Sequence, residues 1–249
     1  MKCRSCLATG LTVIVALIAS SLAQDLHTPN WDEPKAREIA LVISRTWKLS
    51  PDQFQTGTAT SLEHRVYAVL PFDVPDTPRR LILIATASSN ETCHACAPVT
   101  GAVMFELKDG SWRVQYDLPD ITNQGTFGQP PNAHVRRLGP AKPAVEFELI
   151  SMAQGYEASG VTLVAEVDHR LRAVLSVAIG DSNEAADLAP EQTFRWQATI
   201  EVSQTVHHGF ADLIVKSSGT KPAGNGSSIS PYSATETYRF NGETYVKLE

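Results

Sequence analysis

Short strand-forming segments separated by turns are the feature that most constrains the fold of this chain. Asp109-Gly110 and Asn241-Gly242 each separate segments rich in β-branched and aromatic residues. Such pairs favour tight β-hairpins because both turn residues tolerate positive φ. Eleven candidate strands follow one another: residues 65–70, 81–87, 103–107, 112–116, 145–152, 161–167, 172–179, 194–202, 211–216, 235–240 and 245–248. The sequence therefore predicts a mainly β fold, either an antiparallel sandwich or an open barrel.

One segment before these strands has helical periodicity. Asp32 can cap a helix, Pro34 suits its first turn, and apolar residues recur at helical spacing from Ile39 to Trp47. We expect one N-terminal helix over residues 32–47, with its apolar face packed on a sheet.

The N-terminus has the pattern of a secretory signal peptide. Lys2 and Arg4 precede an apolar stretch, and Ser21 and Ala23 place small residues where a signal peptidase cleaves. The apolar stretch is shorter and more interrupted than the ~20 residues of a membrane span. We expect residues 1–23 to be removed, leaving a single β-rich domain over residues 24–249 that is not inserted in a membrane and is periplasmic or secreted.

Charge argues against a nucleic-acid partner. The formal net charge is −6 for the whole chain and −8 once the two basic residues of the signal peptide are removed. A surface of this sign repels nucleic acid and anionic lipid headgroups.

Cys93-His94-Ala95-Cys96 contains the only two cysteines of the predicted mature chain. Haem attachment would need a histidine where Ala97 stands, and a redox dithiol would need a helix N-terminus that the sequence does not predict here. A disulfide between Cys93 and Cys96 is favoured in an oxidising compartment. Cys93, His94 and Cys96 could instead ligate copper(I) or zinc, although the sequence indicates no further ligand and no cofactor is predicted.

Other motifs give no catalytic residue. Gly180-Asp181-Ser182 has the look of the nucleophile block of GDSL-type hydrolases, but no Asp-x-x-His follows it, and turn chemistry explains these residue types. His207 and His208 are neighbours in sequence, so on a strand their side chains point to opposite faces and cannot share one metal ion. On a turn before Gly209 they could bind one weakly, and solvent exposure of both is favoured.

Two stretches rich in glycine and polar residues, 123–143 and 217–235, are interpreted as long loops. Loops on a rigid sheet are frequent binding sites. The predicted binding residues lie in the second loop, where glycines leave the backbone free to adapt: Ser217, Gly219, Gly224 and Gly226.

Several segments resemble uncharacterised secreted or periplasmic β-rich proteins of proteobacteria. They are Cys93 to Gly101 with Phe105 and Trp112, Gly125-Thr126-Phe127-Gly128, Gly209 to Val215, and Tyr238 to Gly242 with Tyr245-Val246. The last of these is similar to the FG-GAP-like ending of many exported β proteins, without the calcium loops of true FG-GAP repeats. The resemblance implies a periplasmic or secreted β protein.

The function expected from the sequence is that of a non-enzymatic binding or inhibitor-type protein. Its partner would be a protein or envelope component, and an inhibitor of a basic host hydrolase such as lysozyme would fit the acidic charge. Two alternatives stay open. One is an envelope hydrolase whose carboxylates meet only in the fold, and the other is a thiol or copper-handling protein that uses Cys93 and Cys96.

Overall fold

The computed structural model describes residues 62–89, 97–109, 111–122, 125–126, 128–223 and 228–249. The predicted signal peptide, the predicted helix over residues 32–47 and the Cys93 to Cys96 motif lie outside these residues. Within the described part of the chain, no helix has the length and apolar character needed to cross a membrane.

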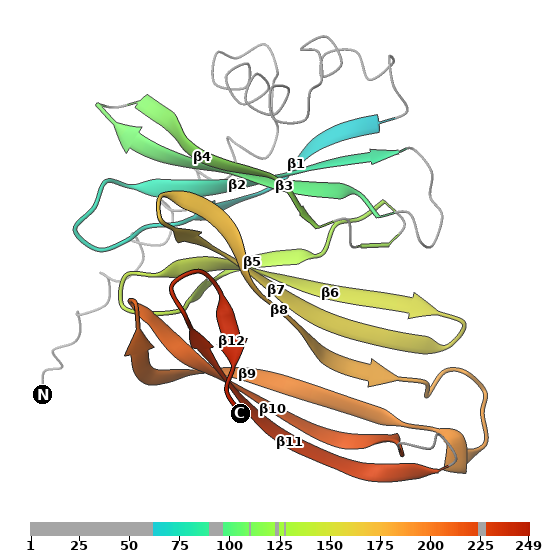
Figure 1. Ribbon diagram of the computed structural model, residues 1–249. Coiled ribbons are helices and arrows are strands. Elements are labelled where there is room, and N and C mark those ends of the chain that lie inside the picture. Colours follow the sequence, from blue (N-terminus) through green and yellow to red (C-terminus); the bar gives the residue numbers. More distant parts are fainter. Residues whose placement is uncertain (1–61, 90–96, 110, 123–124, 127, 224–227) are drawn as a thin grey trace, which may run out of the picture.

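Antiparallel strands make up most of the described chain (Figure 1), which confirms the prediction of a mainly β, antiparallel fold. The strands are β1 (Leu62–Pro71), β2 (Arg80–Ser89), β3 (Val99–Lys108), β4 (Ser111–Thr122), β5 (Asn132–Arg137), β6 (Pro143–Ala153), β7 (Tyr156–Val167), β8 (Arg170–Ser182), β9 (Arg195–His207), β10 (Phe210–Pro222), β11 (Ile229–Phe240) and β12 (Tyr245–Lys247). A 3-10 turn, η1 (Pro190–Gln192), lies between β8 and β9. The strands form a four-stranded sheet, β1 to β4, and an eight-stranded sheet, β5 to β12, each in chain order.

Tight turns explain why neighbours in sequence are neighbours in the sheets. The β6–β7, β7–β8 and β9–β10 connections are two-residue turns, and each has positive φ at both positions: Gln154-Gly155, Asp168-His169 and His208-Gly209. This backbone twist matches that of the flanking strands. The predicted hairpins at residues 109–110 and after Phe240 are both present, but the second has a four-residue loop because Phe240 pairs with Tyr245.

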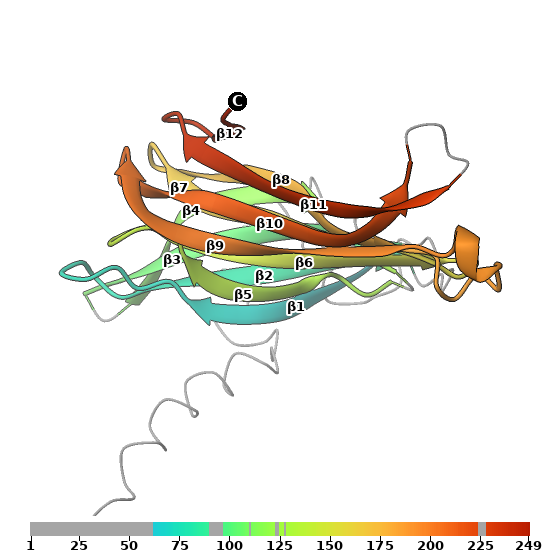
Figure 2. The same cartoon turned by 90° about the horizontal axis from the view of Figure 1, so that it is seen from below.

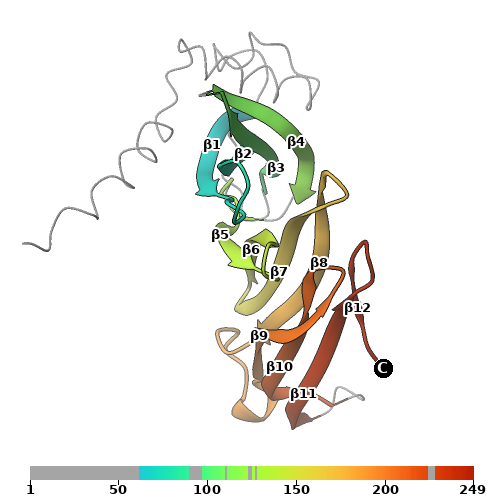
Figure 3. The ribbon, with the colours of Figure 1, turned by 90° about the vertical axis from the view of Figure 1, so that its left-hand side faces the viewer.

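The eight-stranded sheet divides into two layers. β8 and β9 pair at only three positions, close to η1, and diverge from there. Figure 2 places η1 at one end of the molecule and the β9–β10 turn at the other. β5–β8 and β9–β12 therefore face each other across a cluster of buried apolar residues that includes Leu163, Leu213 and Phe240. With β1–β4 on the other side of β5–β8, the molecule has three layers of strands (Figure 3).

The middle layer is buried on both faces. On β6, Val145 and Phe147 contact the cluster shared with the four-stranded sheet, which includes Ile82 and Met104, whereas Ala144 belongs to the cluster on the opposite face. The sequence of a strand that is covered on both faces is a continuous apolar run, whereas a strand covered on one face alternates apolar and polar residues. The same double cover buries Glu146, which lies between Val145 and Phe147.

Both predicted loops are wrong in extent. The segment 123–143 contains β5, and the segment 217–235 is mostly strand, because β10 continues to Pro222 and β11 begins at Ile229. The pattern of β5 was missed because its polar and basic residues, Asn-Ala-His-Val-Arg-Arg, suit a sheet edge where only one face is covered.

Gly219 serves close packing and not loop flexibility. It lies inside β10, with Trp196 and Tyr232 as its neighbours on the flanking strands. Its φ is 136°, and a Cβ atom at this position would lie 2.2 Å from the carbonyl oxygen of Arg195. A side chain is therefore excluded at this position. The close approach of the neighbouring strand, and not the flexibility of a loop, explains the glycine.

Candidate functional site

A cleft of about 680 Å³ continues the core between the two sheets. Its floor is formed by β6, β7 and β8, and residues next to β3 and β4 complete its wall. The lining residues are Ala97, Gly125, Thr126, Leu149, Ile150, Ser151, Ala153, Ala158, Ser159, Gly160, Val161, Thr162, Ser176, Val177 and Ala178. We call this space the inter-sheet cleft.

Strand register explains why the cleft is hollow. Leu149 pairs with Gly160, and Gly160 pairs in turn with Ala178, so these residues lie side by side on one face of the sheet. Further along β6 and β7 the same face carries Phe147 and Val164, which fill the space between the sheets. Small residues replace large ones along this face, and the volume left open is the cleft.

Among the described residues that line the cleft, none has a titratable side chain. Its polar groups are hydroxyls, and two of them are already joined, with Thr162 Oγ1 and Ser176 Oγ 3.0 Å apart. A charged ligand would lose its hydration here without gaining an ion pair. The lining residues that the structure describes therefore suit an uncharged ligand, and their side chains include no acid, base or thiol.

Large apolar side chains are exposed around the β6–β7 hairpin, at one side of the cleft. The exposed fractions are 52% for Ile150, 50% for Met152 and 48% for Tyr156. Ile150 also lines the cleft. Such a group of apolar side chains on a hairpin end is a candidate contact surface for another molecule.

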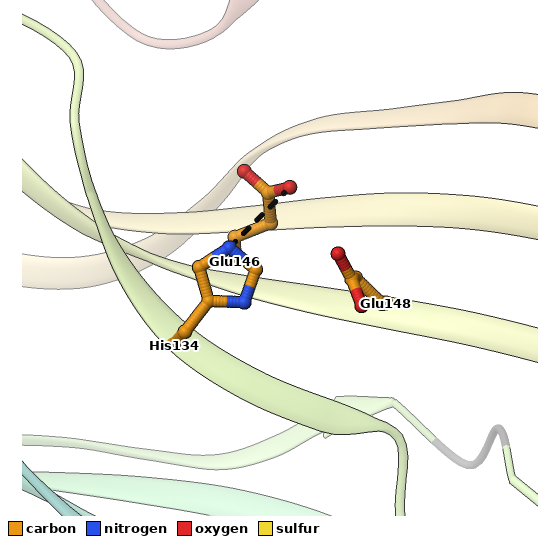
Figure 4. A group of neighbouring side chains, drawn as sticks. All are labelled: His134, Glu146 and Glu148. Carbon is orange, nitrogen blue, oxygen red and sulfur yellow. Dashed lines mark ion pairs between the residues drawn. The ribbon is translucent and has the colours of Figure 1, made fainter. Parts of the chain in front are cut away.

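A second candidate site lies at the sheet edge, where β5 pairs with β6 (Figure 4). His134 on β5 is directly opposite Glu146 on β6, and Glu148 lies two residues further along the same face. One ligand atom from each of the three side chains lies within 4.8 Å of the others. His134 Nε2 and Glu146 Oε1 are 3.7 Å apart.

Burial is the largest influence on Glu146. It raises the pKa of the carboxyl, and the neighbouring Glu148 raises it further, while Arg136 and His134 oppose the shift. Arg136 Nε forms an ion pair with Glu146 Oε2 at 2.6 Å. Glu146 thus lies in a cluster of two acids, a guanidinium and an imidazole.

Asp212 forms a similar but smaller cluster on another strand. This buried carboxylate lies 3.7 Å from His207 Nε2 and 3.3 Å from Arg239 Nη2. His208 occupies the β9–β10 turn. The two neighbouring histidines of the sequence thus have different surroundings.

Of the other predicted site residues, the two that the structure describes belong to neither site. Ser217 and Gly219 lie within β10, whereas Cys93, His94, Cys96, Gly224 and Gly226 lie outside the described residues. Ser182 Oγ accepts a hydrogen bond from the backbone N–H of Glu184, which fits the turn interpretation of the Gly180 segment.

Sequence reasoning missed both candidate sites. The cleft depends on which small residues face the same way, and the His134 cluster depends on a β5–β6 register that cannot be assigned before β5 is recognised. The pattern His-x-Arg followed by Glu-x-Glu was the one available signal, because alternate residues share a face.

Comparisons with known proteins add no assignment. A scan against protein-family models, a search of curated proteins and a search of solved structures each gave no match.

Proposed function

We propose that the protein is an exported, non-enzymatic binding protein that holds an uncharged, largely apolar ligand in the inter-sheet cleft. The observation that carries this proposal is a cleft of about 680 Å³ whose described lining residues have apolar or hydroxyl side chains and no titratable group. Ligand sites in proteins have this size range and are mostly apolar with a few polar groups that orient the ligand.

The size of the cleft limits the ligand class. One water molecule occupies ~30 Å³ in the liquid. A cleft of this volume therefore has room for roughly two dozen non-hydrogen atoms. Leu149 and Ala178 would contact an apolar chain, and the hydroxyl of Ser151 would orient a neutral polar end. A neutral single-chain lipid such as a monoacylglycerol has this chemistry.

The proposal is tested by titrating the purified mature chain with the neutral fluorophore Nile red. We expect saturable binding with blue-shifted emission. We also expect 1-monolauroylglycerol to displace the dye better than laurate or dodecylamine, because the cleft offers no partner for either charge.

A cleft-filling variant makes this test specific. Ala158→Trp places an indole in the cleft and should weaken dye binding at least ~10-fold, the equivalent of about 1.4 kcal/mol. Thr199→Trp adds the same bulk at an exposed position of β9 and should leave binding unchanged. Equal dye binding by the parent and by folded Ala158→Trp, with unchanged circular dichroism, would place the dye elsewhere and refute the proposal.

A macromolecular partner is the second candidate, and the exposed Ile150, Met152 and Tyr156 favour it. A protein or envelope component that contacts this apolar surface would lie beside the cleft. A ligand could then pass between the cleft and that partner. Capture of such a partner by the parent and not by an Ile150→Ser/Met152→Ser variant would support this function independently of the dye.

A further inference from the structure

Three side chains that can ligate a metal ion project from one face of the β5–β6 edge. His134, Glu146 and Glu148 share this face because their strand positions alternate in register. Figure 4 shows the imidazole of His134 beside the two carboxylate-bearing residues of β6. The three ligand atoms lie within 4.8 Å of one another.

The spacing is close to that of a metal site. Zinc binds histidine nitrogen and carboxylate oxygen at ~2.0–2.2 Å in tetrahedral geometry, so two of its ligand atoms lie roughly 3.3–3.6 Å apart. His134 Nε2 and Glu146 Oε1 are 3.7 Å apart, which is too long for a hydrogen bond between them. His134 has 47% of its side-chain surface exposed and can rotate to complete the geometry.

The state of Glu146 is a second, independent observation. Only 5% of its side-chain surface is exposed, and its Oε2 is ion-paired with Arg136 Nε but does not meet hydrogen-bond geometry with it. A buried carboxylate that accepts too few hydrogen bonds is costly unless another cation completes its surroundings. Arg136 takes one side of the carboxylate, which leaves Oε1 directed toward His134.

Charge and ligand type indicate the class of ion. Two carboxylates and one guanidinium leave a local charge of about −1, which attracts a dication. One imidazole and two carboxylates suit zinc and neighbouring transition metals, whereas calcium takes 6–8 oxygen ligands. Three protein ligands also leave one tetrahedral position for water.

We propose that His134, Glu146 and Glu148 form a binding site for a divalent transition-metal ion, with zinc as the best fit. The proposal is independent of the inter-sheet cleft, because neither His134, Glu146 nor Glu148 lines it. The Asp212 cluster has a histidine and an arginine around a single buried acid but no second carboxylate among the described residues, so it provides an internal control.

The test is calorimetric titration of zinc chloride into the mature chain carrying Cys93→Ser/Cys96→Ser, which removes the thiols as competing ligands. One zinc ion per chain should bind. Glu148→Gln and His134→Ala should each weaken zinc binding at least ~10-fold, whereas His207→Ala should leave it unchanged. Calcium chloride should give no comparable heat.

X-ray absorption of the loaded protein supplies a readout apart from affinity, with nitrogen and oxygen neighbours expected at ~2.0–2.2 Å. Absence of saturable zinc binding in the cysteine-free protein would overturn the proposal. So would zinc binding that survives both His134→Ala and Glu148→Gln, or that is lost in His207→Ala.

Discussion

At the residue scale, paired polar groups on the outer strands make a local contribution to stability that depends on pH. Glu236 on β11 accepts hydrogen bonds from Lys247 Nζ at 2.6 Å and from Tyr238 Oη at 2.9 Å. The bond from Lys247 has the largest effect in lowering the pKa of Glu236, followed by the bond from Tyr238. The pKa of Tyr238 is raised to about 12, mainly by burial and secondly by its hydrogen bond to Glu236.

We predict that Glu236→Gln lowers the free energy of unfolding by about 1 kcal/mol at neutral pH. Because the folded pKa of Glu236 is lowered, its stabilisation is present above the unfolded pKa and is lost as the pH falls through the folded value. Urea unfolding of parent and variant at pH 7 and near pH 2.5 measures the difference, which should shrink in acid. Glu201→Gln, at the exposed Lys216–Glu201 pair, is the matched control and should change stability less. A loss for Glu236→Gln that is equal at both pH values would contradict this account.

At the element scale, the hairpin between β10 and β11 shows how strand pairing differs from the expected loop. The two strands pair continuously from Leu213 opposite Tyr238 to Pro222 opposite Ile229. Lys221 lies over the rings of Trp196 and Tyr232, at 3.8 and 3.7 Å from their centroids. The connection proper is therefore only residues 223–228.

We predict that replacing residues 223–228 by Asn-Gly leaves stability within about 1 kcal/mol of the parent, since closure entropy changes by only ~0.6 kcal/mol per doubling of loop length. Nile red should bind the shortened protein as it binds the parent, because the cleft is lined by β6 to β8. Urea unfolding and dye titration check both points. Loss of dye binding in a protein of unchanged stability would give this connection a part in the ligand site. Loss of a captured partner alone would support the expectation that this segment recognises a macromolecule.

The sequence predicted eleven of the twelve strands, because β-branched runs and turn pairs are local signals. The sequence did not predict β5, because its polar and basic residues suit a sheet edge and lack an apolar pattern. It also predicted a loop around Gly219, because a glycine needed for close packing cannot be distinguished in the sequence from a glycine in a loop. The candidate sites were out of reach for a different reason. Leu149, Gly160 and Ala178 come together only through register, and so do His134 and Glu146.

At the scale of the whole molecule, three strand layers place residues of two candidate sites on one strand. Alternate residues of β6 face the four-stranded sheet and the β9–β12 layer, so Leu149 lines the cleft while Glu146 and Glu148 belong to the edge cluster. An ion pair between Arg80 and Glu166 links the four-stranded sheet to β7. The middle layer thus carries both candidate sites and is packed on both faces.

The central claim is that the space between the sheets is a ligand site for an uncharged apolar molecule, and a crystal structure of residues 24–249 with 1-monolauroylglycerol tests it most directly. The account predicts an acyl chain within ~4 Å of Leu149, Gly160 and Ala178, since apolar atoms in contact approach to this distance. In crystals of Ala158→Trp grown with the same lipid, the indole should occupy that place. A cleft filled by another part of this chain, or lipid bound only outside the cleft, would contradict the claim.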